Sequence, residues 1–96
     1  MLNLKVGINL LLVNNKAINP MKVIICVKGG KTVEFSNVTV YTQENMAVIE
    51  CQHKNNNSNK AGEFLSTAID NGFLFVNNEN FMEINVPISK LIAVIP

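Results

Sequence analysis

Residues 21–52 show the clearest alternation of hydrophobic and polar residues in this chain of 96 residues. The hydrophobic positions in the middle of the segment are separated by threonine, glutamate, serine or asparagine: Val33, Phe35, Val38 and Val40. Such alternation is typical of a strand with one buried face and one face in water. Turn signals at 29–30 and 42–45 divide the segment. The pattern therefore predicts a three-stranded β-meander over 21–52, on which the other elements pack.

The glycine pair at 29–30 predicts the first tight turn, because glycine adopts positive φ angles without strain. A loop of either two or four residues places Val27 opposite Thr32. The alternation then assigns one set of residues to the core: Ile24, Cys26, Val33 and Phe35. It leaves the other face of the first strand uncovered, and this face supplies three candidates for a protein interface: Val23, Ile25 and Val27.

The hydrophobic pattern slips by one residue between Phe35 and Val38. One extra residue in a strand is typical of a β-bulge, and we predict one at Ser36-Asn37. With this bulge, Val38 and Val40 return to the core side of the sheet.

Residues 1–20 can be an N-terminal strand appendage, because Asn19-Pro20 breaks the pattern and Met21 could be an alternative start. Hydrophobic residues occupy the even positions of 2–12, which predicts a strand. Its apolar side needs a partner, and pairing with a second chain would provide one. Three of its residues are therefore further interface candidates: Leu4, Val6 and Ile8.

The segment 53–60 contains no hydrophobic residue and is expected to form an exposed loop. A short helix is predicted over 61–71, where hydrophobic residues recur with helical spacing: Ala61, Phe64, Leu65 and Ala68. Gly72 is the expected C-terminal stop of this helix.

Residues 73–96 are expected to supply the C-terminal strands. Strands over 73–76 and 81–86 flank an asparagine-rich turn and predict a hairpin, and a closing strand follows over 91–95. The first strand of the hairpin is apolar on both faces. We expect the helix to cover one face and the meander to cover the other.

Together these elements predict a single small domain that is mostly β, with about seven short strands and one short helix. The strands are expected to form a small bent antiparallel sheet or a partly open barrel, and the alternative is an α+β sheet. A chain of this length buries roughly 65% of its unfolded surface, which leaves room for one core.

Composition narrows the choice of partners. The formal net charge is +1, charged residues make up 16% of the chain, and there is no arginine. Arginine is the usual reader of guanine edges and the usual clamp on phosphate, so specific nucleic-acid recognition is disfavoured. No apolar run approaches the roughly 18 residues of a membrane helix, and no signal peptide is recognisable. We expect a soluble cytoplasmic protein with no membrane partner.

Candidate chemistry is sparse. Cys26, Cys51 and His53 could offer soft ligands to zinc, but a fourth ligand and paired spacing are missing. The two cysteines lie in apolar runs and are expected to be reduced core thiols. His53 has no carboxylate nearby in sequence to orient it, and no serine sits in a nucleophile elbow. We therefore expect no metal, no cofactor, no catalytic residue and no enzymatic activity.

The sequence thus leads to two hypotheses. The first is a non-enzymatic protein-binding or assembly subunit that forms a homo-oligomer; the bias toward asparagine, isoleucine and lysine suggests an accessory protein of a bacterium or its phage. The alternative is a small β-barrel that binds single-stranded nucleic acid through lysines in or near predicted loops: Lys28, Lys31, Lys54 and Lys60.

Overall fold

The computed structural model describes residues 17–55 and 58–96, which contain seven strands and one helix. The strands are β1 (Lys22–Val27), β2 (Lys31–Phe35), β3 (Thr39–Gln43), β4 (Met46–Gln52), β5 (Leu74–Asn77), β6 (Phe81–Pro87) and β7 (Leu91–Ile95). The helix, α2, spans Ser58–Asn71, and short 3₁₀ turns occupy 28–30, 53–55 and 88–90. The predicted N-terminal strand lies outside the described residues, and with it the interface candidates Leu4, Val6 and Ile8.

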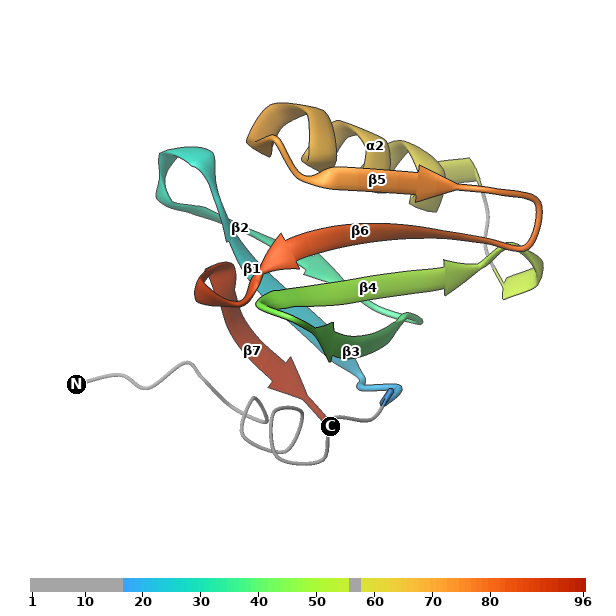
Figure 1. Cartoon of the computed structure of the whole chain (residues 1–96), viewed down its shortest axis with the longest axis horizontal. Helices are drawn as coiled ribbons and strands as arrows, with labels where there is room; N and C mark the ends of the chain where they lie inside the picture. Colours follow the sequence, from blue (N-terminus) through green and yellow to red (C-terminus); the bar gives the residue numbers. More distant parts are fainter. Residues whose placement is uncertain (1–16, 56–57) are drawn as a thin grey trace.

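In the described part of the chain, the strands form two antiparallel sheets rather than a closed barrel (Figure 1). The small sheet has the strand order β2-β1-β7, and the large sheet has the order β3-β4-β6-β5. All pairings between these strands are antiparallel. The prediction of a mostly β fold with short antiparallel strands and one short helix is therefore confirmed.

Residues 36–38 carry the chain from the small sheet to the large sheet, so the predicted three-stranded meander was wrong. Asn37 has a φ of 58°, a left-handed conformation that asparagine tolerates better than most residues. The slip in the hydrophobic pattern therefore marks a change of sheet and not a bulge. Val38 and Val40 are buried, as predicted.

The β1–β2 loop has three residues, 28–30, and this odd number changes the register of the hairpin. Val27 pairs with Lys31 and Ile25 pairs with Val33. Moving the register by one residue exchanges the two faces of a strand. Val23 and Ile25 are consequently 0% exposed, and Val27 is half-buried against the same core. The prediction that these three residues form an uncovered face was wrong.

The core lies between the two sheets and is closed by α2 (Figure 1). Phe35 of the small sheet and Phe64 of α2 meet edge to face, with ring centroids 5.0 Å apart and an interplanar angle of 77°. Aromatic pairs of this geometry contribute about 0.5–1.5 kcal/mol beyond the burial of their area. The large sheet forms the opposite wall with a set of buried side chains: Val40, Ala47, Ile49, Met82, Ile84 and Val86.

Helix α2 begins three residues before the predicted range and ends where predicted. Gly72 follows it with a φ of 70°, and the Phe73 amide donates a 3.0 Å hydrogen bond to the Ala68 carbonyl. This is the geometry of a Schellman motif, which satisfies carbonyls at a helix end. The predicted loop 53–60 is correspondingly shorter, because 53–55 forms a 3₁₀ turn and the helix starts at Ser58.

The C-terminal strands lie close to their predicted positions. β5 and β6 form the expected hairpin, with four consecutive residue pairs. β7 pairs with β1, so the end of the chain returns to the small sheet.

Both cysteines are free thiols, but only one is a core residue. Cys51 is 1% exposed, as predicted. Its burial raises the pKa of the thiol, and the charge of Lys60 lowers it by a smaller amount. Cys26 and Ile24 are only half-buried, because the register of the hairpin directs them away from the core.

Candidate functional site

Helix α2 carries more apolar side chains than its buried side uses. Phe64 and Ala68 are buried against the sheets, and Ala61 packs beside them. Leu65 and Ile69 lie one turn apart on the neighbouring side of the helix and are 45% and 70% exposed. They form an apolar flank along α2.

Strand β5 is also apolar on both faces, and among the described residues one of these faces packs on the core. Phe75 packs on the core, where it pairs with the fully buried Ile84. Leu74 pairs with Asn85 on the outer face and is 62% exposed. The expectation that the helix and the meander cover opposite faces of this strand was wrong, because α2 and the small sheet both pack on the inner side of the large sheet (Figure 1).

One edge of β5 is free of backbone pairing, because among the described residues β5 pairs only with β6. The Asn78 amide donates a 2.9 Å hydrogen bond to the Phe81 carbonyl at the next position of the same ladder. Bonded and non-bonded positions alternate along an antiparallel strand. The backbone groups of residues 74 and 76 therefore point to β6, and those of Phe75 and Asn77 point outward.

Two of the other outer strands, β2 and β3, carry features that oppose pairing with another chain. β2 has charged residues at Lys31 and Glu34, and the Glu34 carboxylate lies 3.1 Å from the Lys22 ammonium. β3 is already bonded on its outer side, because Val40 and Ile18 exchange two 2.9 Å backbone hydrogen bonds. None of the large exposed hydrophobic side chains of the described residues lies on β7.

Within the described residues, β5 lacks three of the usual protections of an edge strand. Its four residues include no charge and no proline, and its register contains no bulge. Natural proteins use lysine, proline or a bulge to block unwanted pairing at such edges. We call this edge, together with the exposed side chains of Leu65 and Ile69 on α2 and Leu74 on β5, the α2–β5 surface. It can accept a strand and bury apolar side chains at the same time.

Part of this surface was visible in the sequence. Leu65 belongs to the helical pattern that predicted α2, but the pattern was interpreted as core throughout. Ile69 lies four residues after Leu65, beside the pair Phe64 and Ala68, so the apolar stripe is wider than a single packed face needs. This excess width is the signal that could have indicated an exposed flank.

The three interface candidates on β1 do not form an exposed surface. Val23 and Ile25 lie in the core, while Val27 lines a groove between the β1–β2 turn and α2, beside Lys28 and Asp70. The groove combines lysine and aspartate side chains, so it has no single sign of charge.

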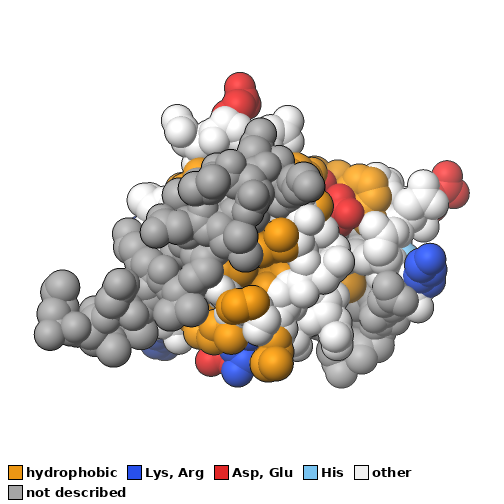
Figure 2. All heavy atoms as spheres, turned by 90° about the horizontal axis from the view of Figure 1, so that it is seen from below, with side chains coloured by type: hydrophobic (Ala, Val, Ile, Leu, Met, Phe, Trp, Pro, Cys, Tyr) orange, Lys and Arg blue, Asp and Glu red, His pale blue; other side chains and the backbone are white. Residues whose placement is uncertain are grey.

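The four lysines proposed to bind nucleic acid are divided between two regions. Lys28 and Lys31 line the groove beside α2. The segments that carry Lys54 and Lys60 lie at the other end of the large sheet (Figure 1), and the Lys60 ammonium donates a 2.8 Å hydrogen bond to the Ser36 carbonyl. On the face seen in Figure 2 the charged side chains are scattered and do not gather into one patch. Nucleic-acid binding stays a prediction, and an oligonucleotide titration at two salt concentrations tests it.

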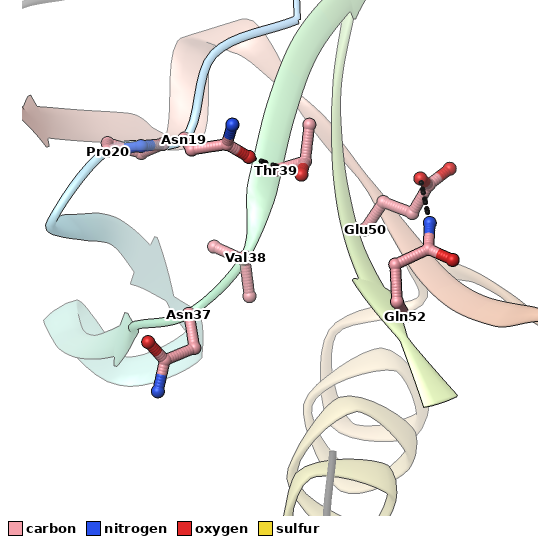
Figure 3. Close-up of a pocket in the computed structure, with 7 residues that line it drawn as sticks. All are labelled: Asn19, Pro20, Asn37, Val38, Thr39, Glu50 and Gln52. Carbon is pink, nitrogen blue, oxygen red and sulfur yellow. Dashed lines mark hydrogen bonds between the residues drawn. The ribbon is translucent and has the colours of Figure 1, made fainter. Parts of the chain in front are cut away.

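A polar hollow of about 510 Å³ opens where β3 separates from β4 (Figure 3). Its polar groups bond largely to one another. The Thr39 hydroxyl donates a 2.7 Å hydrogen bond to Asn19 Oδ1, and Gln52 Nε2 donates a 3.2 Å hydrogen bond to Glu50 Oε1. Glu50 is the one ionisable residue among those that line the hollow. The hollow therefore brings together no nucleophile with a base.

The outer face of the large sheet places two carboxylates opposite each other. Glu50 and Glu83 are direct partners on β4 and β6, and like charges at such positions repel. Each also accepts a hydrogen bond from an amide on its own strand, from Gln52 at 3.2 Å and from Asn85 at 3.0 Å. The pKa of Tyr41 is raised, first by burial and then by the charges of Glu83 and Glu50.

Within 17–55 and 58–96 no three histidine, cysteine, aspartate or glutamate residues are grouped so that they could hold a metal ion. Cys26, Cys51 and His53 accordingly do not converge. His53 Nε2 instead lies 2.9 Å from Asn77 Oδ1 and 2.7 Å from the Asn78 carbonyl oxygen. Among the described helices, none has the length and apolar character needed to cross a membrane.

Comparison with known proteins gives no match: no family model fits the sequence, and neither a curated protein nor a solved structure is significantly similar to the chain. The α2–β5 surface is therefore the feature from which we infer a function.

Proposed function

We propose that this chain is a non-enzymatic assembly subunit that binds protein through the α2–β5 surface, and that the bound partner is a second copy of the same chain. The observation that carries the proposal is the free, uncharged edge of β5 with exposed apolar side chains on both sides: Leu65, Ile69 and Leu74.

The energetic reason is the removal of apolar surface from water. Each exposed leucine or isoleucine gains roughly 1.5–3 kcal/mol when its side chain passes from full exposure to full burial. The gain here is smaller, because the three side chains are 45%, 70% and 62% exposed and not fully exposed. A strand that pairs with the β5 edge would add backbone hydrogen bonds and fix the orientation of the partner.

Charge supports self-association over binding to a charged partner. A twofold interface brings every group next to its own copy, so charges within it would repel. β5 has no charged residue. On α2, Glu63 and Asp70 lie on the side of the helix away from Leu65 and Ile69, as the 3.6-residue repeat requires. A second copy therefore meets this surface without bringing like charges together.

Light scattering on a sizing column tests the proposal. The chain has a mass of 10.6 kDa, and we expect twice this mass at tens of micromolar. Ile69→Lys should dissociate the dimer, because it places a charge in the apolar flank. Glu63→Lys is the matched control, since it puts a lysine on an exposed position of the same helix outside the surface. A monomeric wild-type chain, or equal effects of the two variants, would overturn the proposal.

A further inference from the structure

We infer that Asn71 is a deamidation site, where the Gly72 nitrogen attacks the side-chain amide and water finally takes the place of ammonia. The fold holds the amide away from that nitrogen until the end of α2 opens. Asn71-Gly72 is the one asparagine–glycine pair in the sequence. Glycine in the second position favours the attack, because it has no side chain to hinder its own nitrogen. The inference does not depend on the proposed self-association.

The reaction uses no reagent other than water. The Gly72 nitrogen loses its proton and forms a bond to Cγ of Asn71, the bond from Cγ to Nδ2 breaks, and Nδ2 takes up a proton and leaves as ammonia. The product is a cyclic succinimide. Water opens this ring at either of its two carbonyls. The result at position 71 is aspartate or, when the backbone runs through the former side chain, isoaspartate.

The position has room for the ring. Gly72 is exposed, and among the described residues nothing beyond its chain neighbours lies within 4 Å of the place that a Cβ would occupy. Its φ of 70° lies outside the helical region, so Asn71 is the last residue of α2. Helix ends open locally at a lower free energy than the core of a fold. The reaction can therefore proceed without global unfolding.

Two hydrogen bonds hold the side chain in an unreactive direction. Asn71 Nδ2 donates to the Thr67 carbonyl at 2.9 Å, and Asn71 Oδ1 accepts from the Lys28 amide at 2.7 Å. Thr67 lies one turn earlier in α2, so the amide is directed toward the N-terminal side of Asn71, whereas the Gly72 nitrogen lies on the C-terminal side. Cγ and the attacking nitrogen can meet only after these bonds break and Asn71 leaves the helical conformation.

The bond from Lys28 connects this protection to the tertiary structure. The β1–β2 turn lies beside the C-terminal end of α2 (Figure 1), and its donor to Asn71 is a backbone amide. The Asn71 side chain is released when the turn and the helix separate. The rate of deamidation therefore measures how often this junction opens.

The modified junction is weaker than the original one. An ionised aspartate has no donor, so the bond to the Thr67 carbonyl is lost and two acceptors face each other. The new negative charge also lies at the C-terminal end of α2, where the helix dipole disfavours it. Isoaspartate adds a carbon to the backbone before Phe73, which packs on the core and donates a 3.0 Å hydrogen bond to the Ala68 carbonyl. Both products therefore loosen the attachment of α2 to its neighbours.

Peptide mapping by mass spectrometry tests the inference on the full chain. We would incubate the folded chain and the chain in guanidinium chloride at mildly alkaline pH and follow aspartate and isoaspartate at every asparagine. In denaturant, position 71 should react first. In the folded chain its rate should be at least about tenfold lower, because the reaction waits for local opening. Equal rates in the two states, or a faster asparagine elsewhere in the denatured chain, would overturn the inference.

A matched pair of variants isolates the Lys28 hydrogen bond. Lys28→Pro removes the amide proton, and the extended conformation of Val27, with a φ of −122° and a ψ of 176°, suits a residue before proline. Lys28→Ala keeps the amide. In the folded state, position 71 should deamidate about two- to tenfold faster in Lys28→Pro than in Lys28→Ala, the range expected for one hydrogen bond. Equal rates would show that this bond does not protect Asn71.

Asn71→Asp reproduces one product directly. Its midpoint of denaturant unfolding should lie below that of the wild type, and an unchanged midpoint would overturn the predicted weakening of the junction. The comparison of the folded and denatured wild-type chain decides the deamidation site even if Lys28→Pro does not fold.

Discussion

The backbone amide of Lys28 donates a 2.7 Å hydrogen bond to Oδ1 of Asn71, and this bond joins the β1–β2 turn to the C-terminus of α2. The same side chain donates through Nδ2 to the Thr67 carbonyl at 2.9 Å. Asn71 therefore bonds two backbone groups at once, the Lys28 amide in the β1–β2 turn and the Thr67 carbonyl in the last turn of α2. The bonds connect the hairpin of the small sheet to the helix that closes the core.

We expect Asn71→Ala to lower the free energy of unfolding by about 1–2 kcal/mol, because it removes both hydrogen bonds at once. Chemical denaturation measures the change. Asp70→Ala is the matched control, since Asp70 is exposed at the neighbouring position, and it should stay within about 0.5 kcal/mol. Equal values for the two variants would show that the link between turn and helix contributes nothing to stability.

The β3–β4 turn places a glutamate where glycine is the better residue. Gln43 pairs with Met46, so the loop consists of Glu44 and Asn45, and Glu44 has a φ of 56°. A non-glycine residue in the left-handed region costs roughly 1–2 kcal/mol. Replacing Glu44 with glycine removes this cost. Part of the resulting gain in stability is offset, because glycine is more flexible in the unfolded chain.

Glu44→Gly should therefore raise the free energy of unfolding by about 0.5–1 kcal/mol. The midpoint of denaturant unfolding measures this change in the free energy of unfolding, provided the slope of the transition is unchanged. Asn37→Gly gives the comparison, because Asn37 has a similar φ of 58° but asparagine tolerates this region. Asn37→Gly should therefore raise the free energy of unfolding by less than Glu44→Gly does. A loss of stability in Glu44→Gly would mean that the glutamate side chain has an interaction worth more than the strain.

The types and positions of the elements could be predicted because they depend on local patterns. Alternation identified the strands, and Gly72 marked the end of the helix. The register of the first hairpin could not be predicted, because two, three and four loop residues all fit a glycine pair. The choice of three exchanged the faces of β1 and moved Ile25 from the expected surface into the core.

The sheet boundary and the candidate site depended on contacts between distant parts of the chain. The slip after Phe35 was visible, but a bulge and a change of sheet give the same pattern. The width of the apolar stripe on α2 was visible in the sequence, but only the packing of Phe64 and Ala68 in the core shows that Ile69 is the side chain left exposed. Periodicity shows which residues share a face, but it does not show how many faces the rest of the chain can cover.

His53 follows the end of β4 and forms hydrogen bonds with residues at the β5–β6 turn. Its Nε2 lies within hydrogen-bond distance of two oxygen acceptors, Asn77 Oδ1 and the Asn78 carbonyl, so this nitrogen carries the proton that it shares between them. The sequence predicted that residues 53–60 form an exposed loop. The structure limits this prediction, because the first residue of the segment is docked.

We expect His53→Ala to lower the free energy of unfolding by about 1 kcal/mol, as for other hydrogen bonds near a protein surface. Thermal unfolding followed by circular dichroism measures it. Lys54→Ala serves as the control, because Lys54 is the exposed residue next in the chain, and it should be close to neutral. If both variants unfold like the wild type, the hydrogen bonds of His53 do not contribute to the free energy of unfolding.

Tyr41 gives a direct measure of the electrostatics on the outer face of the large sheet, because it is the single tyrosine of a chain without tryptophan. Its pKa is raised above the ordinary value of 10.0, first by burial and then by the negative charges of Glu83 and Glu50. Ultraviolet difference titration should therefore show the folded chain ionising at higher pH than the chain in denaturant. Glu83→Gln and Glu50→Gln should each lower the pKa of Tyr41 in the folded state.

The same shift determines how stability depends on alkaline pH. The folded state holds the phenol proton more tightly than the unfolded state, so this contribution is fully present below the unfolded pKa of Tyr41, near 10.0. It is lost as the pH rises from that value through the folded pKa, because the unfolded chain then releases its proton first. Tyr41→Phe should remove this part of the loss of folding stability at alkaline pH. Denaturant unfolding at pH values on both sides of the unfolded pKa compares the variant with the wild type, and identical pH profiles would show that the ionisation of Tyr41 is not linked to folding.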